Sequence, residues 1–525
     1  MSLHGLNFIG AELRAGHAPA PATSPLDRST LEPGFHQASV DDVDTALLAA
    51  DHAFSTYRVT TGEQRAVFLE RIADELVALG DELIVRGHLE TGLPQARLLG
   101  ERGRTVAQLR LFASVAREGS WVDARLDTAQ PDRQPVPKPD LRRMLIPIGP
   151  VIVFGSSNFP LAFSVAGGDT ASALATGNPV IVKAHSGHPG TSELAATAIR
   201  RAIDACGLPA GVFSMLHGAG KVIGAALVRH PLARAVGFTG SRAAGRALFD
   251  IAAARPEPIP VFAEMSSTNP VFILPGALRE RTVPLAEGLR TSVTMGVGQF
   301  CTKPGLVFAL DGPSFDTFAD TLSALIAGVP PSTMLHAGIA EAYHEGLAQA
   351  TTVSGVTSVA TSSAAADPGK THAEAALART DVTHYLGHHE LTEEVFGPFT
   401  LLVSAGQISD LEGVARTLGG QLTATVHGTP DDLAQAGPLL SLLEQKVGRL
   451  IVNGFPTGVE VCPSMNHGGP YPATTDVRFT SVGTAALFRF VRPICYQDVP
   501  AQHLPDALKD GNPLGISRMK DGARE

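Results

Sequence analysis

Several residue classes are scarce in this chain, and each scarcity excludes a kind of protein. The 525 residues include one Trp, five Tyr and four Cys. The cysteines are too far apart for a CxxC redox or zinc pair, which excludes a zinc finger and a disulfide scaffold. Uninterrupted apolar runs of about 18 residues are lacking, which excludes a membrane-spanning helix. The chain has 41 basic and 51 acidic residues, and the resulting net charge of −10 argues against nucleic-acid binding.

What the chain does contain is typical of a large globular protein. Hydrophobic residues make up 44% and charged residues 18%, which excludes disorder as the main state. The length predicts two to four domains. The N-terminal residues show no export signal, because Glu12 and Arg14 interrupt the only apolar candidate. We therefore expect reduced thiols and a cytoplasmic location.

The pattern of hydrophobic residues divides the chain into regions. Residues 40–120 show the spacing of amphipathic helices. From about residue 144, short apolar β-rich runs alternate with Ala-rich helical stretches, which predicts a parallel sheet covered on both faces. A second α/β region extends from about 265 to 470. Residues 124–142 are polar and Pro-rich, and are either a solvent linker or a protruding hairpin that pairs with another subunit.

Three residues lie at the ends of predicted helices or strands, where α/β proteins commonly have their catalytic groups. Cys301, in GQFCTKPG, lies between a predicted helix and a strand, where a thiolate can face a cleft; a buried structural cysteine is the alternative. Glu264 ends an apolar strand. It is either an acid that faces a ligand or an ordinary loop carboxylate. Asn158, in SSNFP, has an amide that can stabilise an oxyanion or simply form a turn.

Two glycine-containing turns and a lysine follow predicted strands. HGAGKVIGAAL is one residue longer than the GxGxxG fingerprint, so by itself it is weak support for a dinucleotide site. In GFTGSRAAGR, Ser241 is placed to cap a helix and offer amides to a phosphate. Lys183 ends the strand PVIVK, either as a surface lysine or as a ligand for ribose hydroxyls. The 18 histidines form no ligand motif, and we interpret them as solvated or structural.

Taken in order, these segments resemble the aldehyde dehydrogenase superfamily. The matching pieces include ETGLP, PIGPV, SSNFP, NPVIVK, VGFTGS, GQFCTKPG, EEVFGPF and RLIVNGFPTG. The resemblance implies an α/β fold of two open parallel-sheet, Rossmann-like domains with a small oligomerisation element made of a hairpin and a strand. It places the cofactor-binding domain at residues 1–124 and 148–263 and the catalytic domain at 264–471. Residues 125–147 and 472–525 would form the oligomerisation element and the tail.

The same resemblance implies roles for the three candidate catalytic residues. Cys301 would attack an aldehyde carbon to form a thiohemiacetal, and Asn158 would hold its oxyanion. After hydride transfer to a nicotinamide, Glu264 would activate the water that hydrolyses the thioester. The residues implied to bind the cofactor are Lys183, Ser186, Gly220, Lys221, Gly240, Ser241, Glu394 and Phe396.

Departures from the usual family motifs favour one branch. SSNFP replaces PWNFP, and Glu264 is followed by Met-Ser-Ser-Thr instead of Leu-Gly-Gly-Lys. These segments resemble the 2-oxoglutarate semialdehyde (2,5-dioxovalerate) dehydrogenases, in which hydrolytic oxidation with NADP is usual. Ser186 replaces an acid that would repel a 2′-phosphate, and Lys221 adds a cation, so we expect NADP, with NAD possible. Arg290 is one candidate for the substrate carboxylate.

Other functions remain open at this point. They are a broad-specificity aliphatic, succinate or glutarate semialdehyde dehydrogenase, a coenzyme A-acylating enzyme, a cysteine hydrolase that pairs Cys301 with a histidine, and a non-catalytic relative. The expected partner is a small aldehyde, with no nucleic acid, membrane or metal. The resemblance also implies a homodimer or homotetramer.

Overall fold

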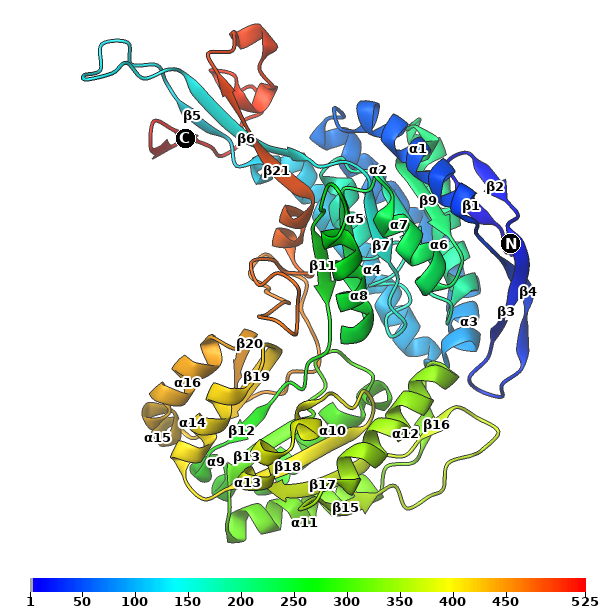
Figure 1. Cartoon of the computed structure of the whole chain (residues 1–525), viewed down its shortest axis with the longest axis vertical. Helices are drawn as coiled ribbons and strands as arrows, with labels where there is room; N and C mark the ends of the chain where they lie inside the picture. The colour runs from blue at the N-terminus through cyan, green and yellow to red at the C-terminus, as the bar shows by residue number, and fades with distance from the viewer. Residues whose placement is uncertain (1–2) are drawn as a thin grey trace.

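The structure, a computed structural model, describes residues 3–525. Its upper lobe in Figure 1 is built on a sheet with the strand order β11-β10-β7-β8-β9-β1-β2. The strands from β11 to β9 run parallel, and β1 and β2 add an antiparallel edge. The strands are β1 Asn7–Ile9, β2 Glu12–Arg14, β7 Val151–Phe154, β8 Val180–Lys183, β9 Phe213–Leu216, β10 Ala235–Thr239 and β11 Val261–Glu264.

Alternate residues of the central strands enter two hydrophobic cores, one on each face of this sheet. Val151 and Val153 pack with α2, α4, α5 and α6, whereas Ile152 and Phe154 pack with α1, α7 and α8. The expected parallel sheet, apolar on both faces, is thus confirmed. The helices, which include those expected between residues 40 and 120, are α1 Val40–Tyr57, α2 Gly62–Ala78, α3 Gly80–Thr91, α4 Gln95–Glu118, α5 Gly168–Ala175, α6 Pro189–Cys206, α7 Ala225–Arg229 and α8 Arg242–Ala253.

The lower lobe repeats this layered plan with a second sheet of order β15-β17-β18-β13-β12-β19-β20. Only β15 pairs antiparallel. Phe272 and Phe308 face a core with α12, α14 and α16, and Val271 and Val307 face one with α10 and α11. The elements are β12 Val271–Ile273, α10 Thr282–Thr294, β13 Leu306–Leu310, α11 Pro313–Ala327, α12 Ala337–Thr352, β15 Thr357–Thr361, β17 Ala376–Asp381, β18 Phe399–Ala405, α14 Ile408–Thr417, β19 Gln421–His427, α16 Gly437–Glu444 and β20 Val447–Val452.

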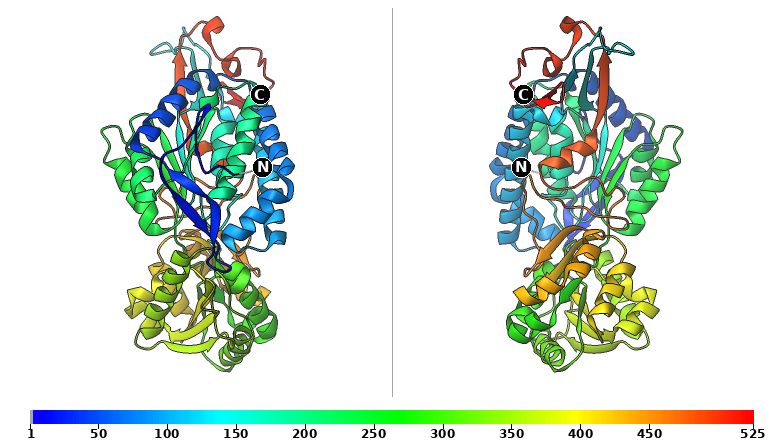
Figure 2. Two further views of the ribbon diagram at one scale, coloured as in Figure 1. Left: turned by 90° about the vertical axis from the view of Figure 1, so that its right-hand side faces the viewer. Right: turned by 90° about the vertical axis from the view of Figure 1, so that its left-hand side faces the viewer.

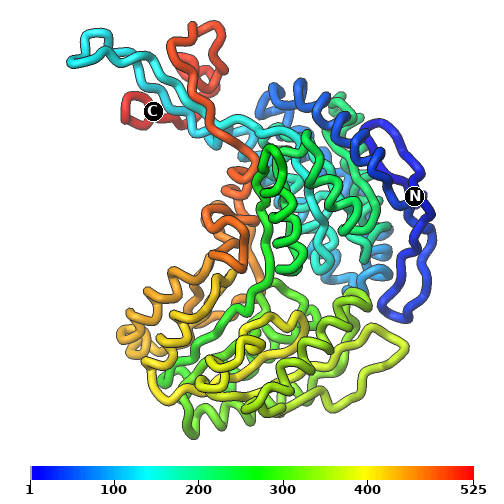
Figure 3. Tube along the Cα trace, in the orientation of Figure 1, coloured from blue at the N-terminus to red at the C-terminus, as the bar shows by residue number. Residues whose placement is uncertain are grey.

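The chain passes between the two lobes twice. It leaves the first sheet after β11 and enters the second at β12, and after β20 it returns beside β11, as the orange part of the trace shows (Figure 3). Thr474 of the returning segment forms an isolated bridge with Glu264, and the Met265 amide donates to the Ala473 carbonyl at 2.7 Å. Residues from both lobes and from the returning segment therefore meet at the end of β11.

A third, smaller sheet projects from the upper lobe at the end opposite the second lobe (Figure 2). Its order is β21-β6-β5-β22-β23, so the Pro-rich hairpin and the chain's last residues belong to one sheet. Leu508 and Ile516 of the tail are buried in the main core. Among residues 3–525, no helix is long and apolar enough to cross a bilayer. The strands are β5 Arg125–Asp127, β6 Leu141–Pro147, β21 Val491–Gln497, β22 Met519–Lys520 and β23 Ala523–Arg524.

A buried carboxylate joins two helices of the upper lobe. Glu90, at the end of α3, is fully buried and accepts the backbone N–H groups of Gly190 and Thr191 at 2.7 and 2.8 Å. These are the first amides of α6, which lack partners within their own helix. Arg86 neutralises the carboxylate at 2.8 Å. The Glu90 carboxylate thus both caps α6 and forms an ion pair with Arg86.

We expect Glu90→Ala to lower the free energy of unfolding by about 3 kcal/mol, because it leaves a buried guanidinium without its partner. Urea denaturation followed by circular dichroism measures the shift in midpoint. The control is Asp74→Ala, which removes an exposed ion pair with Arg110 and is expected to cost less than about 1 kcal/mol. Equal shifts in the two variants would contradict the prediction.

Candidate active site

Cys301 lies on a loop that begins where α10 unwinds. Residues 296–298 take left-handed backbone conformations, with φ between 56 and 66°. A Cβ at Gly298 would stand 2.3 Å from the carbonyl carbon of Gly397, so only glycine allows the two loops to approach. The loop then leads into β13. Cys301 is half-buried, so the residue is not sealed in the interior.

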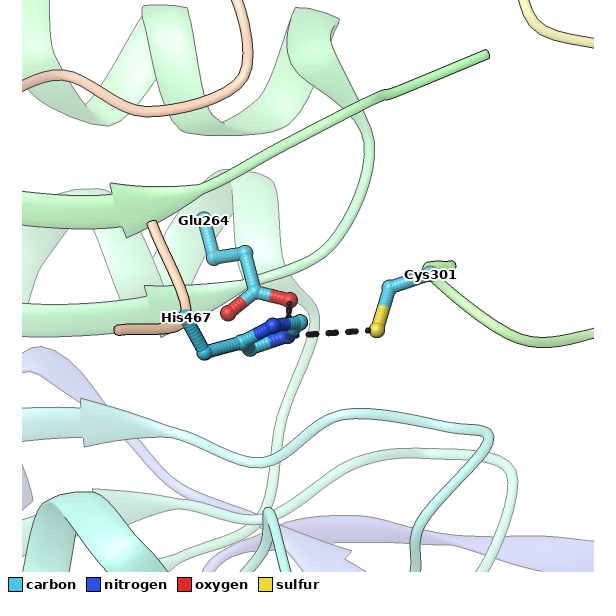
Figure 4. Close-up of side chains that lie close together, drawn as sticks. All are labelled: Glu264, Cys301 and His467. Carbon is cyan, nitrogen blue, oxygen red and sulfur yellow. Dashed lines mark hydrogen bonds and ion pairs between the residues drawn. The ribbon is translucent and has the colours of Figure 1, made fainter. Parts of the chain in front are cut away.

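Glu264 and His467 complete a close cluster with the sulfur (Figure 4). His467 Nε2 lies 2.9 Å from Glu264 Oε1 and 3.4 Å from Cys301 Sγ. The Ser481 hydroxyl donates to the other carboxylate oxygen at 2.5 Å. Glu264 ends β11 of the first sheet, Cys301 precedes β13 of the second, and His467 and Ser481 come from the returning segment. The sequence prediction that Glu264 ends an apolar strand is confirmed.

The cluster shifts the acidities of its members in opposite directions. Burial, followed by the charge of Glu264 and its hydrogen bond, raises the pKa of Cys301 well above its ordinary value, and Arg104 acts against this. Burial also acts to raise the pKa of Glu264, but His467 and the hydrogen bonds from His467, Ser481 and Cys301 outweigh it. The pKa of Glu264 is therefore lowered. The resting site holds a neutral thiol beside an ionised carboxylate.

Asn158 is held against the cysteine loop. Its side-chain Nδ2 donates to the Gln299 carbonyl at 3.1 Å, two residues before Cys301. Its own carbonyl accepts a hydrogen bond from Arg97 at 2.7 Å. Glu101 fixes the residues that follow by accepting the Leu161 amide at 2.8 Å. Asn158 is thus anchored to the loop that carries Cys301, and its role as oxyanion donor stays a prediction.

The predicted cofactor residues of the first sheet lie at its carboxyl edge, where parallel sheets bind ligands. Lys183 is the last residue of β8, and the other turns follow β8, β9 and β10. Burial alone lowers the pKa of Lys183 to about 8, so the surface-lysine interpretation is wrong. A Cβ at Gly220 would meet nothing within 4 Å, which leaves open space above its backbone. The exposed residues of these turns are Ser186, Gly220, Lys221, Gly240 and Ser241.

The two predicted phosphate turns differ in local structure. Residues from Gly220 to Gly224 form one π-helical turn before α7, so the longer glycine spacing corresponds to an irregular helix start. Ser241 caps α8 as predicted, because its Oγ accepts the Ala244 amide at 3.3 Å. Arg242 then forms an ion pair with Glu393 at 2.8 Å. This contact brings the second lobe's Glu393 loop to the start of α8.

Glu394 and Phe396 lie in that loop, next to a lysine that the sequence analysis did not single out. Burial raises the pKa of Glu394 to about 7, and the charge of Lys303 opposes the shift. Burial lowers the pKa of Lys303 to about 8. Lys303 Nζ donates to the carbonyls of Val395 and Phe399 at 3.0 and 2.9 Å. These hydrogen bonds hold the segment that carries Cys301 against the segment that carries Glu394 and Phe396. The Phe396 side chain is half-buried.

His467 is not one of the solvated histidines, and it lies in a close cluster of potential ligands that the sequence analysis did not anticipate. Its side chain is 1% exposed and touches both candidate catalytic groups. It lies 166 residues from Cys301 along the chain, too far for any spacing motif to reveal. The only sequence signal is its place before Gly468-Gly469 in a Pro- and Gly-rich segment. Cys301, His467 and Glu264 also bring three potential metal ligands within 4.8 Å of one another, and the expectation of no metal stays a prediction.

Comparison with known proteins gives this site a family. A model described as the aldehyde dehydrogenase family matches residues 15–470. The chain belongs to that family. It is 53% identical over 527 residues to alpha-ketoglutaric semialdehyde dehydrogenase 2 of Azospirillum brasilense, covering all of both chains. It is 47% identical to alpha-ketoglutaric semialdehyde dehydrogenase of Acinetobacter baylyi, covering 99% of this chain and 98% of that one.

Solved structures share the fold of this chain at low sequence identity. An Escherichia coli NADP-dependent enzyme matches 94% of this aldehyde dehydrogenase and 98% of its own chain, with a TM-score of 0.79 at 22% identity. A 1-pyrroline-5-carboxylate dehydrogenase from Thermus with bound NAD matches 94% and 92%, with a TM-score of 0.79 at 20% identity. The predicted α/β fold class is thus confirmed, and the chain is an oxidoreductase that acts on aldehydes.

The shifted acidities predict how Cys301 responds to pH. Because its pKa is raised, alkylation by iodoacetamide in the cofactor-free enzyme should accelerate with pH and reach no plateau by pH 9, the ordinary thiol value. Glu264→Gln removes a negative charge that raises this pKa, so the rate at pH 7.5 should increase several-fold, about 3- to 10-fold for a shift of half to one unit.

Peptide mass spectrometry separates Cys301 from the other three cysteines in this experiment. The matched control is Glu257→Gln, an exposed carboxylate paired with Arg234, which should leave the profile unchanged. A plateau near neutral pH, or slower alkylation in Glu264→Gln, would contradict the prediction.

Proposed function

We propose that this aldehyde dehydrogenase oxidises 2-oxoglutarate semialdehyde (2,5-dioxopentanoate) to 2-oxoglutarate, with NADP as the preferred cofactor. Full-length similarity to two enzymes named for this substrate supports the proposal. The observation that carries the chemistry is the contact of one imidazole nitrogen with both Cys301 and Glu264. It joins a nucleophile and a base that lie in different lobes.

The first half of the reaction belongs to Cys301 and Asn158. The Cys301 thiol passes its proton to the hydrogen-bonded Glu264 carboxylate, which releases it to solvent before the second half of the reaction. The resulting thiolate sulfur bonds to the aldehyde carbon, and the carbonyl oxygen becomes an oxyanion. The Asn158 amide and the Cys301 backbone N–H donate to this oxygen. A bound oxidised nicotinamide supplies the acceptor for the hydride that leaves the carbon. A thioester then remains on Cys301.

The second half belongs to Glu264. Its lowered pKa keeps it ionised at neutral pH, so it is ready to accept a proton from water. The water oxygen bonds to the thioester carbon, and the Cys301 sulfur leaves as a thiolate. His467 and Ser481 hold the two carboxylate oxygens and orient the base. The products are the carboxylic acid and the free enzyme.

The residues at the edge of the first sheet fit a dinucleotide that carries a 2′-phosphate. Lys183 offers a buried ammonium whose pKa is altered by burial alone, and the turn at Gly220 leaves open space. Lys183 and Glu394 would hold ribose hydroxyls, and Gly240 and Ser241 the pyrophosphate. Ser186 and the exposed Lys221 favour NADP over NAD without excluding NAD.

The Cys301–His467 contact raises a second candidate, hydrolysis by a cysteine–histidine pair. In such a pair the base accepts the thiol proton through one ring nitrogen, and a carboxylate holds the other. Here Nε2 contacts both the sulfur and Glu264, while Nδ1 is buried without a hydrogen-bond partner among the described residues. The geometry therefore favours a carboxylate base over a histidine base. A coenzyme A-acylating enzyme is disfavoured too, because Glu264 would hydrolyse its thioester.

We also propose a cytoplasmic homodimer or homotetramer. The third sheet ends in β21, whose residues are largely exposed. An exposed edge strand of this length pairs readily with another chain. The four cysteines are free thiols, which suits a reducing compartment.

The domain boundaries expected from the sequence stay predictions. Glu264, which was expected to begin the catalytic domain, is the last residue of a strand in the first sheet.

A panel of aldehydes tests the proposed function. With NADP, kcat/KM for 2-oxoglutarate semialdehyde should exceed that for succinic, glutaric and simple aliphatic aldehydes by about tenfold or more, because a site that hydrogen-bonds the polar groups of one substrate discriminates against substrates that lack them. Absorbance of the reduced cofactor measures turnover, with Cys301→Ala as the inactive control. Equal efficiency across the panel would favour a broad-specificity enzyme. Turnover that depends on coenzyme A would favour the acylating alternative.

The cofactor preference has its own test. We expect Lys221→Ala combined with Ser186→Glu to lower the NADP/NAD ratio of kcat/KM by about 10- to 100-fold, because a cation is lost and a repelling carboxylate is introduced. Lys509→Ala, in the C-terminal tail, is the control for the loss of a positive charge. An unchanged ratio would show that the phosphate is held by other residues.

A further inference from the structure

One arginine beside the nucleophile has an unused pair of hydrogen-bond donors. Arg104 lies on α4, and its guanidinium stacks on the rings of Phe159 and Phe163 at 5.7 and 5.3 Å from their centroids. Its Nε and Nη2 are buried and have no hydrogen-bond partner among the described residues. These two nitrogens form one side of the guanidinium, the side that grips a carboxylate with two parallel hydrogen bonds.

Arg104 is close enough to the reacting groups to act on them electrostatically. Its positive charge lowers the pKa of Cys301. Burial lowers the pKa of Arg104 itself, and the charges of Glu101, Cys301, Glu264 and Glu460, in this order, oppose that shift. A chain of ring contacts gives the same placement. Phe159, on which Arg104 stacks, packs edge-on against Phe300 at 5.3 Å, and Phe300 directly precedes Cys301.

The nearest carboxylate does not use these donors. Glu101, one turn earlier on α4, is buried and spends Oε1 on the amides of Leu161 and Ala162 at 2.8 and 3.0 Å. It forms no ion pair with Arg104 in the described chain. A buried cation without a hydrogen-bonded partner is costly, which makes this side of Arg104 a place where an anion gains most.

Other arginines in this region do not leave two adjacent buried donors free. Arg97 donates from Nη2 to the Asn158 carbonyl and stacks on Phe300 at 4.9 Å, and only its Nη1 is buried without a partner. Arg449 donates both terminal nitrogens to backbone carbonyls, of Gly458 and Pro456. Arg290, the candidate from the sequence, lines a different hollow, with Met295, Phe455 and Thr457. Among the described residues near the nucleophile, Arg104 thus offers the free two-donor side.

We propose that Arg104 binds the carboxylate of the 2-oxo acid substrate and so selects for aldehydes that carry a distal anion. This inference rests on the proposed function. The substrate's carboxylate carbon is four bonds from its aldehyde carbon, so a site beside the nucleophile suits it. Because Nε and Nη2 are covered in the free protein, the side chain has to shift within the plane of its guanidinium as the substrate enters. The stacked rings of Phe159 and Phe163 then hold the plane of the guanidinium.

The test compares a charged and a neutral aldehyde of equal length in two variants. Arg104→Met should raise KM for 2-oxoglutarate semialdehyde by about 10- to 100-fold, whereas kcat/KM for pentanal should fall much less, by the effect of the lost charge on the Cys301 pKa alone. Arg104→Lys keeps the charge without the paired donors, so its KM for the charged substrate should lie between those of wild type and Arg104→Met. Arg110→Gln, on the exposed face of the same helix, should change neither value.

Binding of the product measures the same contact without turnover. In a Cys301→Ala background, calorimetry should give a Kd for 2-oxoglutarate that Arg104→Met raises by the same factor, about 10- to 100-fold, while NADP binding is unchanged. Retained activity on pentanal, or unchanged NADP binding, shows that the variant is folded.

The outcomes separate this inference from the function on which it rests. If wild type does not oxidise 2-oxoglutarate semialdehyde, the proposed function is wrong. If wild type does so and Arg104→Met keeps KM and product Kd within about twofold of wild type, the function stands and Arg104 is not the carboxylate site. A parallel loss of activity on pentanal and on the charged substrate would show a structural role and would overturn the inference as well.

Discussion

A single nitrogen, His467 Nε2, connects the parts of the molecule on which the chemistry depends. It lies 2.9 Å from a carboxylate at the end of the first sheet and 3.4 Å from a thiol at the entrance to the second. Neither lobe contains both groups, and the histidine belongs to the segment that returns between them. The active site therefore exists only while the two lobes and that segment stay docked. The hydrogen bonds of the segment to β11 are part of the catalytic geometry as much as of the fold.

The cost of burying charge explains how the rest of the site is arranged. Glu90 is buried, accepts two backbone amides and pairs with Arg86, so its carboxylate is satisfied and fixes the neighbouring segment. Glu101 fixes Leu161 and Ala162 through Oε1 alone, and its Oε2 is buried without a hydrogen-bond partner. The Lys303 ammonium likewise donates hydrogen bonds to two backbone carbonyls. Against this pattern, the unused donors of Arg104 are an exception. Arg104 leaves two adjacent donors buried without a partner, and it lies beside the candidate nucleophile.

Much of the fold followed from the pattern of residues. The apolar runs around residues 151, 180 and 271 predicted buried parallel strands, and they are buried because both faces of each sheet carry helices. The positions of Cys301 and Glu264 at element ends were also predicted correctly. The roles of His467 and Lys303 were not predicted, since neither has a motif and each acquires its role from a contact that spans 92 or more residues. The burial of Lys183 was undecided for the same reason, because a strand's last residue faces solvent or protein according to what packs beyond it.

The amino-acid sequence by itself determined the layered α/β architecture and the family, and it singled out the candidate nucleophile, base and oxyanion donor. These depend on local periodicity and on short segments whose order along the chain is informative. Only the tertiary structure decided which histidine joins nucleophile and base, which lysine ties the cofactor loop to the cysteine loop, and which arginine is left with free donors. The physical reason is that pairing and burial are properties of distances between side chains, and folding brings together groups that the sequence places far apart.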